Sequence, residues 1–407
     1  MTGFEVEAIR QDFPIFSEKM NNKPLVYLDN AASTQKPRAV IDRVKQFYES
    51  EYATVNRGVY ALGGAATEMV ETVRKQVQEF IGARESSEII FTRGTTESIN
   101  LVAHAYGRKF LGAGDEIIIS VIEHHSNIVP WQILCEEKGI NLKVIPVNDK
   151  GELLLDAYEE LISKRTKLVS IGHISNALGT INPLKVIIDR AHSVGAKVVV
   201  DGAQGAPHSN LNVMALDCDF YGFSGHKLFG PTGVGVLYGK KELLEKMDPF
   251  LGGGDMIKSV SMEKTEYADP PQKFEAGTPP IAQIIGMGAA LKYITQIGMD
   301  AIVSYEQMLL KVALEALDEI EDINIIGTAE NKASVISFLI GDIHPHDIGT
   351  VMDQEGIAIR AGHHCAQPTM RRFKVPATAR ASFSLYNTVE DIHALVRGIH
   401  KVKEIFQ

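Results

Sequence analysis

Short apolar runs rich in β-branched residues alternate with stretches that have the composition of helices. The runs occupy residues 88–92, 116–120, 167–171, 197–201, 220–223 and 233–238. Some of them, such as Val198-Val199-Val200, are apolar without interruption, which indicates that both faces of the strand are buried. This alternation predicts an α/β fold in which helices cover both faces of a mostly parallel sheet.

The rhythm changes in the last third of the chain. A long helix-like stretch at residues 284–320 leads into β-rich runs at 334–340 and 356–360. The chain has 407 residues, and single hydrophobic cores stop growing at about 250–300 residues. We therefore expect a second, smaller α+β domain at the C-terminus.

Charge and hydropathy exclude two classes of partner. Lys and Arg number 41 against 51 Asp and Glu, so the net charge of −10 repels nucleic acid and anionic membranes. The apolar runs are all shorter than the ~18 residues that a membrane span needs. Residues 1–7 are acidic where a signal peptide would be basic, so we expect a cytoplasmic protein.

The three cysteines, Cys135, Cys218 and Cys365, are too few and too scattered for a disulfide framework. A reducing compartment fits this pattern. Cys135 and Cys218 have the neighbours of small core residues, and we expect both to be buried. Cys365 lies in a different setting, among histidines.

Lys227 follows Ser224-Gly225-His226, and Asp201 ends one of the apolar runs. An aldehyde cofactor such as pyridoxal 5′-phosphate (PLP) needs an amine for a Schiff base and an anion that keeps its ring nitrogen protonated. Lys227 and Asp201 could supply these two groups. The pair therefore indicates a covalently bound PLP.

A phosphate site is indicated where Thr95 and Thr96 follow a predicted strand. Backbone N–H groups at a helix start bind anions, and the two hydroxyls would add donors. A helix cap with Thr95 and Ser98 at capping-box spacing explains Thr95 about as well. Residues 233–235 do not make a dinucleotide site, because Tyr238 stands where the third glycine of that fingerprint belongs.

His124 and Asn176 each follow a predicted strand, where the carboxyl edge of a parallel sheet holds ligands. His124 could stack on a pyridine ring, and a half-exposed loop histidine is an equal alternative. Asn176 could bond a cofactor or substrate oxygen, or it could be a turn residue. Arg380 could bind a carboxylate through two N–H groups, although a lone arginine is more often a surface charge.

Cys365 follows His363 and His364 in a loop that contains glycine. A thiol in such a place can be held as a mobile thiolate, which an attacking nucleophile needs. A zinc site that adds His344 and His346 is the alternative. It is disfavoured because adjacent ligands rarely chelate one tetrahedral ion and no C-x-x-C pair accompanies them.

The motifs together, in their order along the chain, resemble those of the cysteine desulfurases, which are fold-type I PLP enzymes of the class V aminotransferase family. They are residues 29–32 (Asp-Asn-Ala-Ala), 93–96 (Arg-Gly-Thr-Thr), 123–127 (Glu-His-His-Ser-Asn), 201–204 (Asp-Gly-Ala-Gln), 224–227 (Ser-Gly-His-Lys) and 360–365 (Arg-Ala-Gly-His-His-Cys). The last motif is similar to the short cysteine loop of the SUF-type, or second, group. The resemblance implies a seven-stranded, mostly parallel sheet in a large domain at 25–295. A small domain from 1–24 and 296–407 would carry the cysteine loop.

The resemblance also implies roles for individual residues. Lys227 would form the Schiff base, Asp201 would pair with the pyridinium, and Cys365 would take the sulfur. His124 would stack on the ring and take part in catalysis. The other cofactor contacts would come from Thr95, Thr96, Asn176, Gln204, Ser224, His226 and, from the second subunit of a homodimer, Thr278. The substrate would be held by Asn176, Arg360 and Arg380.

The implied activity is a PLP-dependent sulfurtransferase reaction that converts L-cysteine to L-alanine. The persulfide on Cys365 would pass to a SufE-like or zinc-containing scaffold acceptor for iron–sulfur cluster assembly. With the zinc-containing acceptor, His346 could be a transient zinc ligand, and a surface turn at Pro345 explains the stretch equally well. A selenocysteine lyase or cysteine sulfinate desulfinase would not need Cys365. A non-catalytic scaffold would not need Lys227.

One stretch departs from the family pattern. Many members have a His-Arg-Gly-x-His stretch near the substrate entrance, whereas this chain has Asn56 and Tyr60 in place of the two histidines. Proton handling or substrate access at this entrance therefore stays open. The cofactor motifs themselves are intact.

Overall fold

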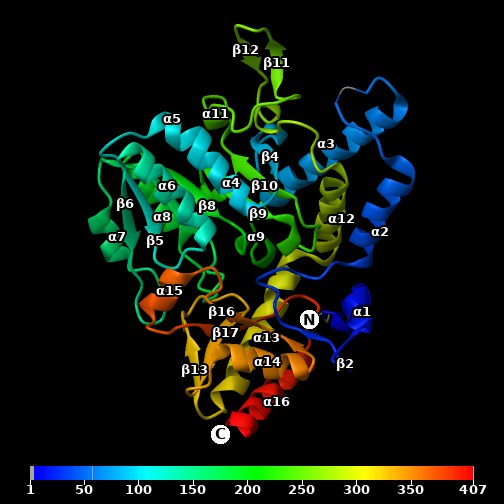
Figure 1. The fold of residues 1–407 in the computed structure, drawn as a ribbon, viewed down its shortest axis with the longest axis vertical. Coiled ribbons are helices and arrows are strands. Elements are labelled where there is room, and N and C mark those ends of the chain that lie inside the picture. Colours follow the sequence, from blue (N-terminus) through cyan, green and yellow to red (C-terminus); the bar gives the residue numbers. More distant parts are fainter. Residues whose placement is uncertain (1–3, 57, 407) are drawn as a thin grey trace.

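The computed structural model describes residues 4–56 and 58–406. Its largest sheet has seven strands in the order β4-β10-β9-β8-β7-β5-β6. In that order they are β4 (Ile89–Thr92), β10 (Gly235–Gly239), β9 (Phe220–Ser224), β8 (Lys197–Asp201), β7 (Thr166–Gly172), β5 (Glu116–Ser120) and β6 (Asn141–Ile145). β10 runs antiparallel to both of its neighbours, and the other pairs are parallel. The predicted mostly parallel seven-stranded sheet is confirmed (Figure 1).

The strands are apolar because both faces of the sheet are covered. Along β5, Ile118 belongs to one buried cluster and Ile117 belongs to the other. Val198 and Val199 divide in the same way along β8. Successive side chains of a strand point to opposite faces of the sheet. Because both faces are buried, every position of these strands requires an apolar residue.

Two groups of helices provide this cover. On the first face pack α2 (Arg38–Gln46), α3 (Ala61–Ile81), α7 (Leu155–Leu161), α8 (Leu184–Ser193), α10 (Val213–Leu216) and α12 (Ile281–Ile297). On the second face pack α4 (Thr95–Leu101), α6 (Val129–Lys138) and α11 (Lys241–Leu244). The short helices α5 (Arg108–Phe110) and α9 (Gly205–His208) complete this part.

Helix α12 packs against α2 and α3, and two of its glycines allow the helices to approach closely. A Cβ at Gly286 would lie 2.6 Å from Val44 Cγ2 of α2. A Cβ at Gly288 would lie 2.5 Å from Val73 Cγ2 of α3. Both distances are far below van der Waals contact, so these two positions require glycine.

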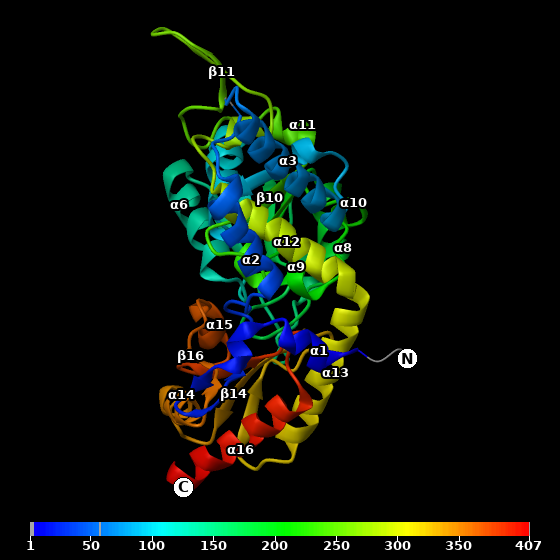
Figure 2. The same ribbon diagram turned by 90° about the vertical axis from the view of Figure 1, so that its right-hand side faces the viewer.

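The C-terminal part forms a second layered unit. Gly298, with φ of 93°, separates α12 from α13 (Met299–Asp318). An antiparallel sheet has the order β13 (Ile323–Ile326), β14 (Val335–Ile340), β17 (Thr378–Ser382) and β16 (Arg360–Gly362). The helices α13, α14 (Pro345–Gln354) and α16 (Val389–Phe406) share a third apolar cluster with it. Figures 1 and 2 show this smaller α+β unit below the large sheet.

The amino-terminal segment packs beside the smaller unit. It contains α1 (Val6–Gln11), a two-stranded sheet of β1 (Lys19–Met20) and β2 (Lys23–Pro24), and β3 (Val26–Tyr27). Arg10 of α1 forms an ion pair with Asp391 of α16 at 3.0 Å. The domain boundaries at residues 25 and 295 stay a prediction.

Two sequence expectations differ in detail from the structure. The run at 356–360 is two strands rather than one, because β15 (Ile357–Ala358) pairs with β3 whereas β16 pairs with β17. Strand β6 has no counterpart among the expected runs. It lies at the sheet edge and exposes Asn141 and Val144, so its sequence lacks a continuous apolar run.

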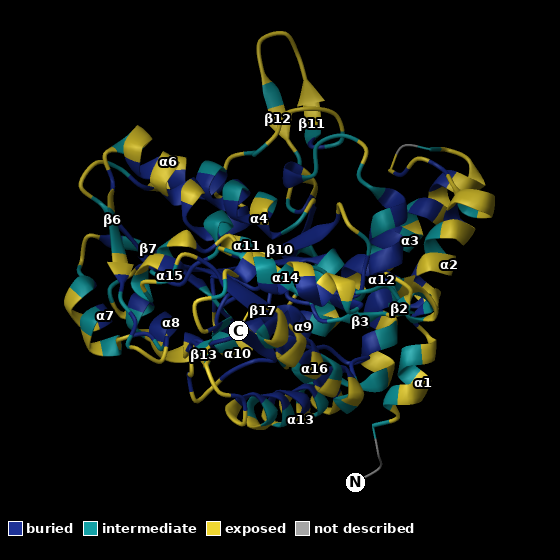
Figure 3. Cartoon of the chain, turned by 60° about the horizontal axis from the view of Figure 1, so that its bottom comes forward, coloured by how far each residue is buried: buried dark blue, intermediate teal, exposed yellow. Residues whose placement is uncertain are grey.

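A β-hairpin of β11 (Ile257–Val260) and β12 (Thr265–Tyr267) projects from the large unit. Figure 3 shows that it is mostly exposed, in contrast to the buried strands of the sheet. Within residues 4–56 and 58–406, no helix combines the length and the apolar character needed to cross a bilayer.

Candidate active site

A cavity lies where strands of the large sheet end and the smaller unit begins. Asp201, Gly172 and Ser224, the last residues of β8, β7 and β9, line it. The smaller unit contributes Arg360, His364, Cys365 and Arg380. Of the sequence-predicted site residues, the cavity brings together Thr95, Thr96, His124, Asn176, Asp201, Gln204, Ser224, His226, Lys227, Arg360, Cys365 and Arg380.

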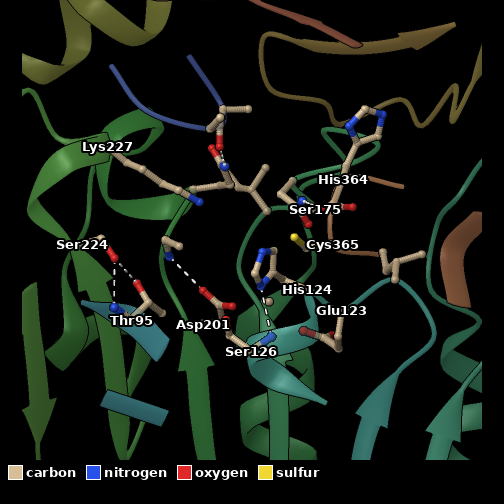
Figure 4. Close-up of a pocket in the computed structure, with 18 of the residues that line it drawn as sticks. Thr95, Glu123, His124, Ser126, Ser175, Asp201, Ser224, Lys227, His364 and Cys365 are labelled. Carbon is tan, nitrogen blue, oxygen red and sulfur yellow. Dashed lines mark hydrogen bonds between the residues drawn. The ribbon is translucent and has the colours of Figure 1, made fainter. Parts of the chain in front are cut away.

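Lys227 ends a single 3₁₀ turn (Gly225–Lys227) that directly follows β9. Figure 4 shows its side chain extending into the cavity. Burial lowers the pKa of Lys227 to about 8, although the charge of Asp201 acts in the opposite direction. A larger fraction of this amine is therefore neutral, and hence nucleophilic, than of an exposed lysine.

Asp201 lies at the carboxyl end of β8 and is 7% exposed. Its Oδ1 accepts a hydrogen bond of 3.0 Å from the backbone N–H of Ala203. Burial raises the pKa of this carboxyl, and the N–H of Ala203 and the charge of Lys227 oppose that shift. A buried carboxylate of this kind is stabilised by a cationic partner such as a protonated ring nitrogen.

His124 lies between the sheet and the cysteine loop. Its Nδ1 accepts a hydrogen bond of 3.1 Å from the N–H of Ser126, which leaves the proton of the neutral ring on Nε2. Burial and the charge of Lys227 lower the pKa of His124 to about 3. The ring is therefore neutral, which suits stacking on an aromatic cofactor.

The predicted phosphate residues already form a hydroxyl network. Ser224 Oγ lies 2.9 Å from the backbone N and 2.8 Å from the Oγ1 of Thr95 (Figure 4). Thr96 Oγ1 lies 2.7 Å from Ser126 Oγ. Helix α4 begins with Thr95, and its N-cap is Gly94. The alternative in which Thr95 is the cap is therefore wrong, and its hydroxyl, paired with Ser224, lies at the cavity wall.

Two arginines share one carboxylate beside the cavity. Arg360 and Arg380 are directly opposite on β16 and β17, where like charges repel. Asp29 offsets this repulsion, because it accepts hydrogen bonds of 3.0 Å from Arg360 Nη2 and 3.1 Å from Arg380 Nη2. Arg380 also donates to the carbonyl of Asn176 at 2.8 Å.

Several buried polar atoms of the cavity residues have no partner among the described residues. They are Asn176 Oδ1, Asn182 Oδ1, Gln204 Oε1, His364 Nδ1 and Arg380 Nε. Such atoms are costly unless a ligand or water satisfies them. Gln204 Nε2 donates to the carbonyl of Ala31 at 2.6 Å. Buried donors and acceptors beside an amine and a carboxylate fit a polar aromatic aldehyde such as PLP.

Cys365 lies on the loop between β16 and α15 (Gln367–Arg372) and is exposed. Cys135 and Cys218 are buried, as the sequence predicts. His364 is buried and its Nε2 lies 2.8 Å from Thr378 Oγ1, whereas His363 is exposed. Throughout residues 4–56 and 58–406, no group of three or more His, Cys, Asp or Glu side chains could hold a metal ion.

Two predicted residues lie outside this cavity. Thr278 is exposed on the loop before α12, consistent with the expectation that it serves a second subunit. His346 is exposed near the start of α14, where its N–H donates to His344 Nδ1 at 3.2 Å. Pro345 begins helix α14, so the stretch is a helix start at the surface, and a zinc-ligand role for His346 stays a prediction.

The cavity also contains Glu123, for which the sequence analysis predicts no role. Glu123 is buried and accepts hydrogen bonds from Ser120 and, at 2.7 Å, from Asn127. Burial raises the pKa of Glu123 to about 7. Glu123 stands directly before His124 in the motif at residues 123–127, and this position is the signal by which the sequence could indicate it.

The departing stretch at residues 56–60 is only partly described. Asn56 and Tyr60 are exposed and do not line the cavity, and Arg57 lies outside the described residues. Asn56 and Tyr60 therefore lie away from the cavity of their own subunit.

Comparison with known proteins identifies the family of the chain. The aminotransferase class-V family matches residues 26–395. A cysteine desulfurase of Dickeya dadantii is 51% identical over 403 residues, which cover 99% of this chain and 98% of that protein. The crystal structure of the cysteine desulfurase CsdA from Escherichia coli has a TM-score of 0.93 and 40% identity, and the match covers 99% of this chain and 100% of that one.

An apo cysteine desulfurase from Thermococcus onnurineus also has a TM-score of 0.93 and 40% identity, and 98% of each chain is covered. Both structures share the fold over nearly their whole length. With the family match and the half-identical relative of nearly equal length, this likeness means that the chain belongs to the aminotransferase class-V family, among the cysteine desulfurases.

Proposed function

We propose that the chain is a PLP-dependent cysteine desulfurase, which converts L-cysteine to L-alanine and leaves the sulfur as a persulfide on Cys365. One observation carries this proposal. A partly buried amine, a buried carboxylate and an exposed thiol, on Lys227, Asp201 and Cys365, line a single cavity. The amine and the carboxylate belong to the large unit, and the thiol belongs to the smaller unit.

The proposed cofactor residues hold PLP from several sides. Lys227 would form the covalent link, Asp201 would pair with the ring nitrogen, and His124 would stack on the ring. The oxygens of PLP would be bound by Thr95, Thr96, Ser224, His226 and Gln204. When it is bound, PLP supplies an electron sink for the Cα of the substrate.

The proposed chemistry needs a residue that transfers a proton and a residue that acts as a nucleophile. The Lys227 amine carries a proton at the substrate Cα, for which a pKa of about 8 is well matched. The Cys365 thiolate attacks the substrate sulfur, so that a new S–S bond forms as the C–S bond breaks. The electron pair of the C–S bond stays with Cβ, which takes up a proton to become the methyl group of alanine. Arg380, Arg360 and Asn176 hold the substrate carboxylate.

The finer assignment is a SUF-type enzyme that acts as a homodimer in the cytoplasm. Exposure of Thr278 outside the cavity supports a role for it at the site of a second copy. The free Cys365 thiol needs a reducing compartment. The persulfide would then pass to an acceptor protein for iron–sulfur cluster assembly.

Mass spectrometry of the protein after incubation with L-cysteine tests the proposal. We expect one added sulfur atom on Cys365 and none on the buried Cys135 and Cys218. Cys365→Ala should gain no sulfur and should lose activity on L-cysteine by roughly 10³-fold, whereas activity on selenocysteine should persist. Equal turnover of L-cysteine by this variant would favour the selenocysteine lyase or sulfinate desulfinase alternatives.

Lys227→Ala tests the cofactor assignment and the scaffold alternative. Without the amine, the protein should lack the visible absorbance band of a lysine-bound PLP. It should also form alanine from L-cysteine at least about 10³-fold more slowly. Normal turnover in this variant would exclude Lys227 as the cofactor lysine.

A further inference from the structure

The Cys365 loop has a backbone conformation that it could not keep unaided. His364 and Cys365 are consecutive non-glycine residues, and each has φ of 54°. Side chains at such angles crowd their own carbonyl groups, so these conformations persist only where surrounding contacts hold them. The contacts around Cys365 therefore decide where its thiol lies.

The first half of the loop is held by the cavity wall. The carbonyl of His364 accepts a hydrogen bond of 2.6 Å from Asn176 Nδ2. The imidazole of His364 lies 2.8 Å from Thr378 Oγ1. These contacts fix the chain before the thiol.

The second half of the loop is held by His125. The N–H of His125 donates to the carbonyl of Cys365 at 2.7 Å. Its Nε2 accepts a hydrogen bond of 3.0 Å from the N–H of Gln367, the first residue of α15. The N-cap of this helix is Ala366, which has no polar side chain, so His125 supplies the missing cap from another segment.

His125 is also the residue after His124, whose neutral ring lines the cavity. His124, the proposed ring-stacking residue, is therefore directly bonded to His125, which holds the cysteine loop. Burial and the nearby His363 lower the pKa of His125, which keeps the imidazole neutral and able to accept at Nε2. The rings of His124 and His125 have centroids 6.4 Å apart.

We propose that His125 is a positioning residue, which fixes the reach of Cys365 by holding the chain on the C-terminal side of the thiol. This inference rests on the proposed function, since it concerns the step in which Cys365 takes the sulfur. His125 touches the loop backbone rather than the reacting atoms. Its loss should therefore slow attack by Cys365 and leave the cofactor site unchanged.

Three substitutions at this position separate the hydrogen bond from other effects. His125→Gln places an amide oxygen near the place of Nε2 and can still accept from Gln367. His125→Asn is the matched control, because its oxygen reaches only to the place of Nδ1. His125→Ala removes the acceptor, and all three variants keep the backbone N–H that bonds Cys365.

The experiment uses the PLP-loaded enzyme and follows persulfide formation on Cys365 in a single turnover. We expect a loss on the order of 10-fold to 100-fold for His125→Ala and His125→Asn, with recovery in His125→Gln. KM for L-cysteine and the visible absorbance of the cofactor should stay unchanged. Selenocysteine turnover, measured beside Cys365→Ala, should also stay unchanged.

Hydrogen exchange of the peptide that contains residues 363–370 gives a readout that does not depend on turnover. It should be faster in the alanine and asparagine variants and near the wild-type rate in His125→Gln. Wild-type persulfide formation in His125→Ala would overturn the inference. An equal loss with selenocysteine, or no recovery in His125→Gln, would also overturn it. A wild-type enzyme that forms no persulfide would instead contradict the proposed function.

Discussion

At the scale of the residue, the chemistry of the cavity depends on an amine whose charge has been destabilised. Burial lowers the pKa of Lys227 from 10.5 to about 8. The protonated form therefore dominates below about pH 8, and the neutral form dominates above it. Only the neutral amine can attack an aldehyde.

This shift predicts how the apo-protein takes up PLP. The rate of covalent attachment should rise about tenfold per pH unit up to about pH 8 and then level off, because it follows the neutral fraction of Lys227. Growth of the visible absorbance band after addition of PLP measures this rate. Lys227→Ala is the control and should show no band. A rate that keeps rising to pH 10.5 would show that burial does not affect this amine.

Asp201 should act through its charge rather than its shape. Asp201→Asn keeps the volume of the side chain and removes the anion that would hold the ring nitrogen protonated. We expect PLP to stay bound while turnover of L-cysteine falls by about 10²-fold. Parallel measurement of bound PLP and of alanine formation checks this. Unchanged turnover would place Asp201 outside the cofactor chemistry.

The residues with reactive or charged groups that a cofactor needs could be predicted from the sequence. The residues that position those groups through hydrogen bonds could not. Lys227 and Asp201 could be inferred because an aldehyde cofactor needs an amine and an anion. Asp29 stands in the motif at residues 29–32, but the sequence does not indicate that it accepts hydrogen bonds from both Arg360 and Arg380. Its role depends on strands that are far apart in the chain, and no local pattern encodes such a pairing.

At the scale of the element, a buried arginine joins helix α3 to the loop that carries Thr278. Arg74 is 2% exposed and donates to Glu275 Oε1 at 2.7 Å and to the carbonyl of Ile89 at 2.8 Å. Glu275 Oε1 also accepts from the N–H of Phe91 in β4, at 2.7 Å. The ion pair therefore fixes the start of the Thr278 loop against the sheet.

Arg74→Ala should destabilise the protein by about 3–5 kcal/mol, because it leaves the Glu275 carboxylate buried without its cation. Lys75→Ala is the matched control on the exposed side of the same helix and should change stability by less than about 0.5 kcal/mol. Urea denaturation of both variants beside the wild type measures the difference. Equal stability of the two variants would contradict the role of Arg74.

Within the large sheet, element prediction succeeded for the strands buried on both faces and missed the edge strand β6. The runs that became β5, β7 and β8 are covered on both faces, so their apolar character is continuous. Strand β6 lies at an edge and has polar positions, which weakens that pattern. The split between β15 and β16 depends on pairing with β3 and β17, which the sequence of a single run cannot reveal.

At the scale of the whole molecule, the cavity is shared by the large unit and the smaller unit. Helix α14 packs near β16, where a Cβ at Gly349 would lie 3.4 Å from Ala361 Cβ. Strand β16 then leads into the Cys365 loop. The exposed His346 at the start of α14 is thus on the same unit as the thiol that an acceptor would have to reach.

If the acceptor is a zinc-containing scaffold protein, His346 should exchange with one of its zinc ligands and free an acceptor thiol. His346→Ala should then keep formation of one persulfide per active site and lose stimulation of turnover by that acceptor. His344→Ala is the neighbouring control, because it removes the helix cap but keeps the exposed imidazole of His346. Undiminished stimulation in His346→Ala would exclude this exchange.

The reversed strand β10 has a consequence for the order in which the molecule is made. β4 pairs only with β10, and β10 joins it to β9 and the rest of the sheet. A ribosome that has synthesised β4 and Thr95 must continue through Lys227 to Gly239 before β4 can enter the sheet. The nascent chain therefore holds an unpaired apolar strand during most of the synthesis of the large unit, and such strands are prone to aggregate. Premature termination before β10 should leave a chain that chaperones and proteases recognise as unfinished.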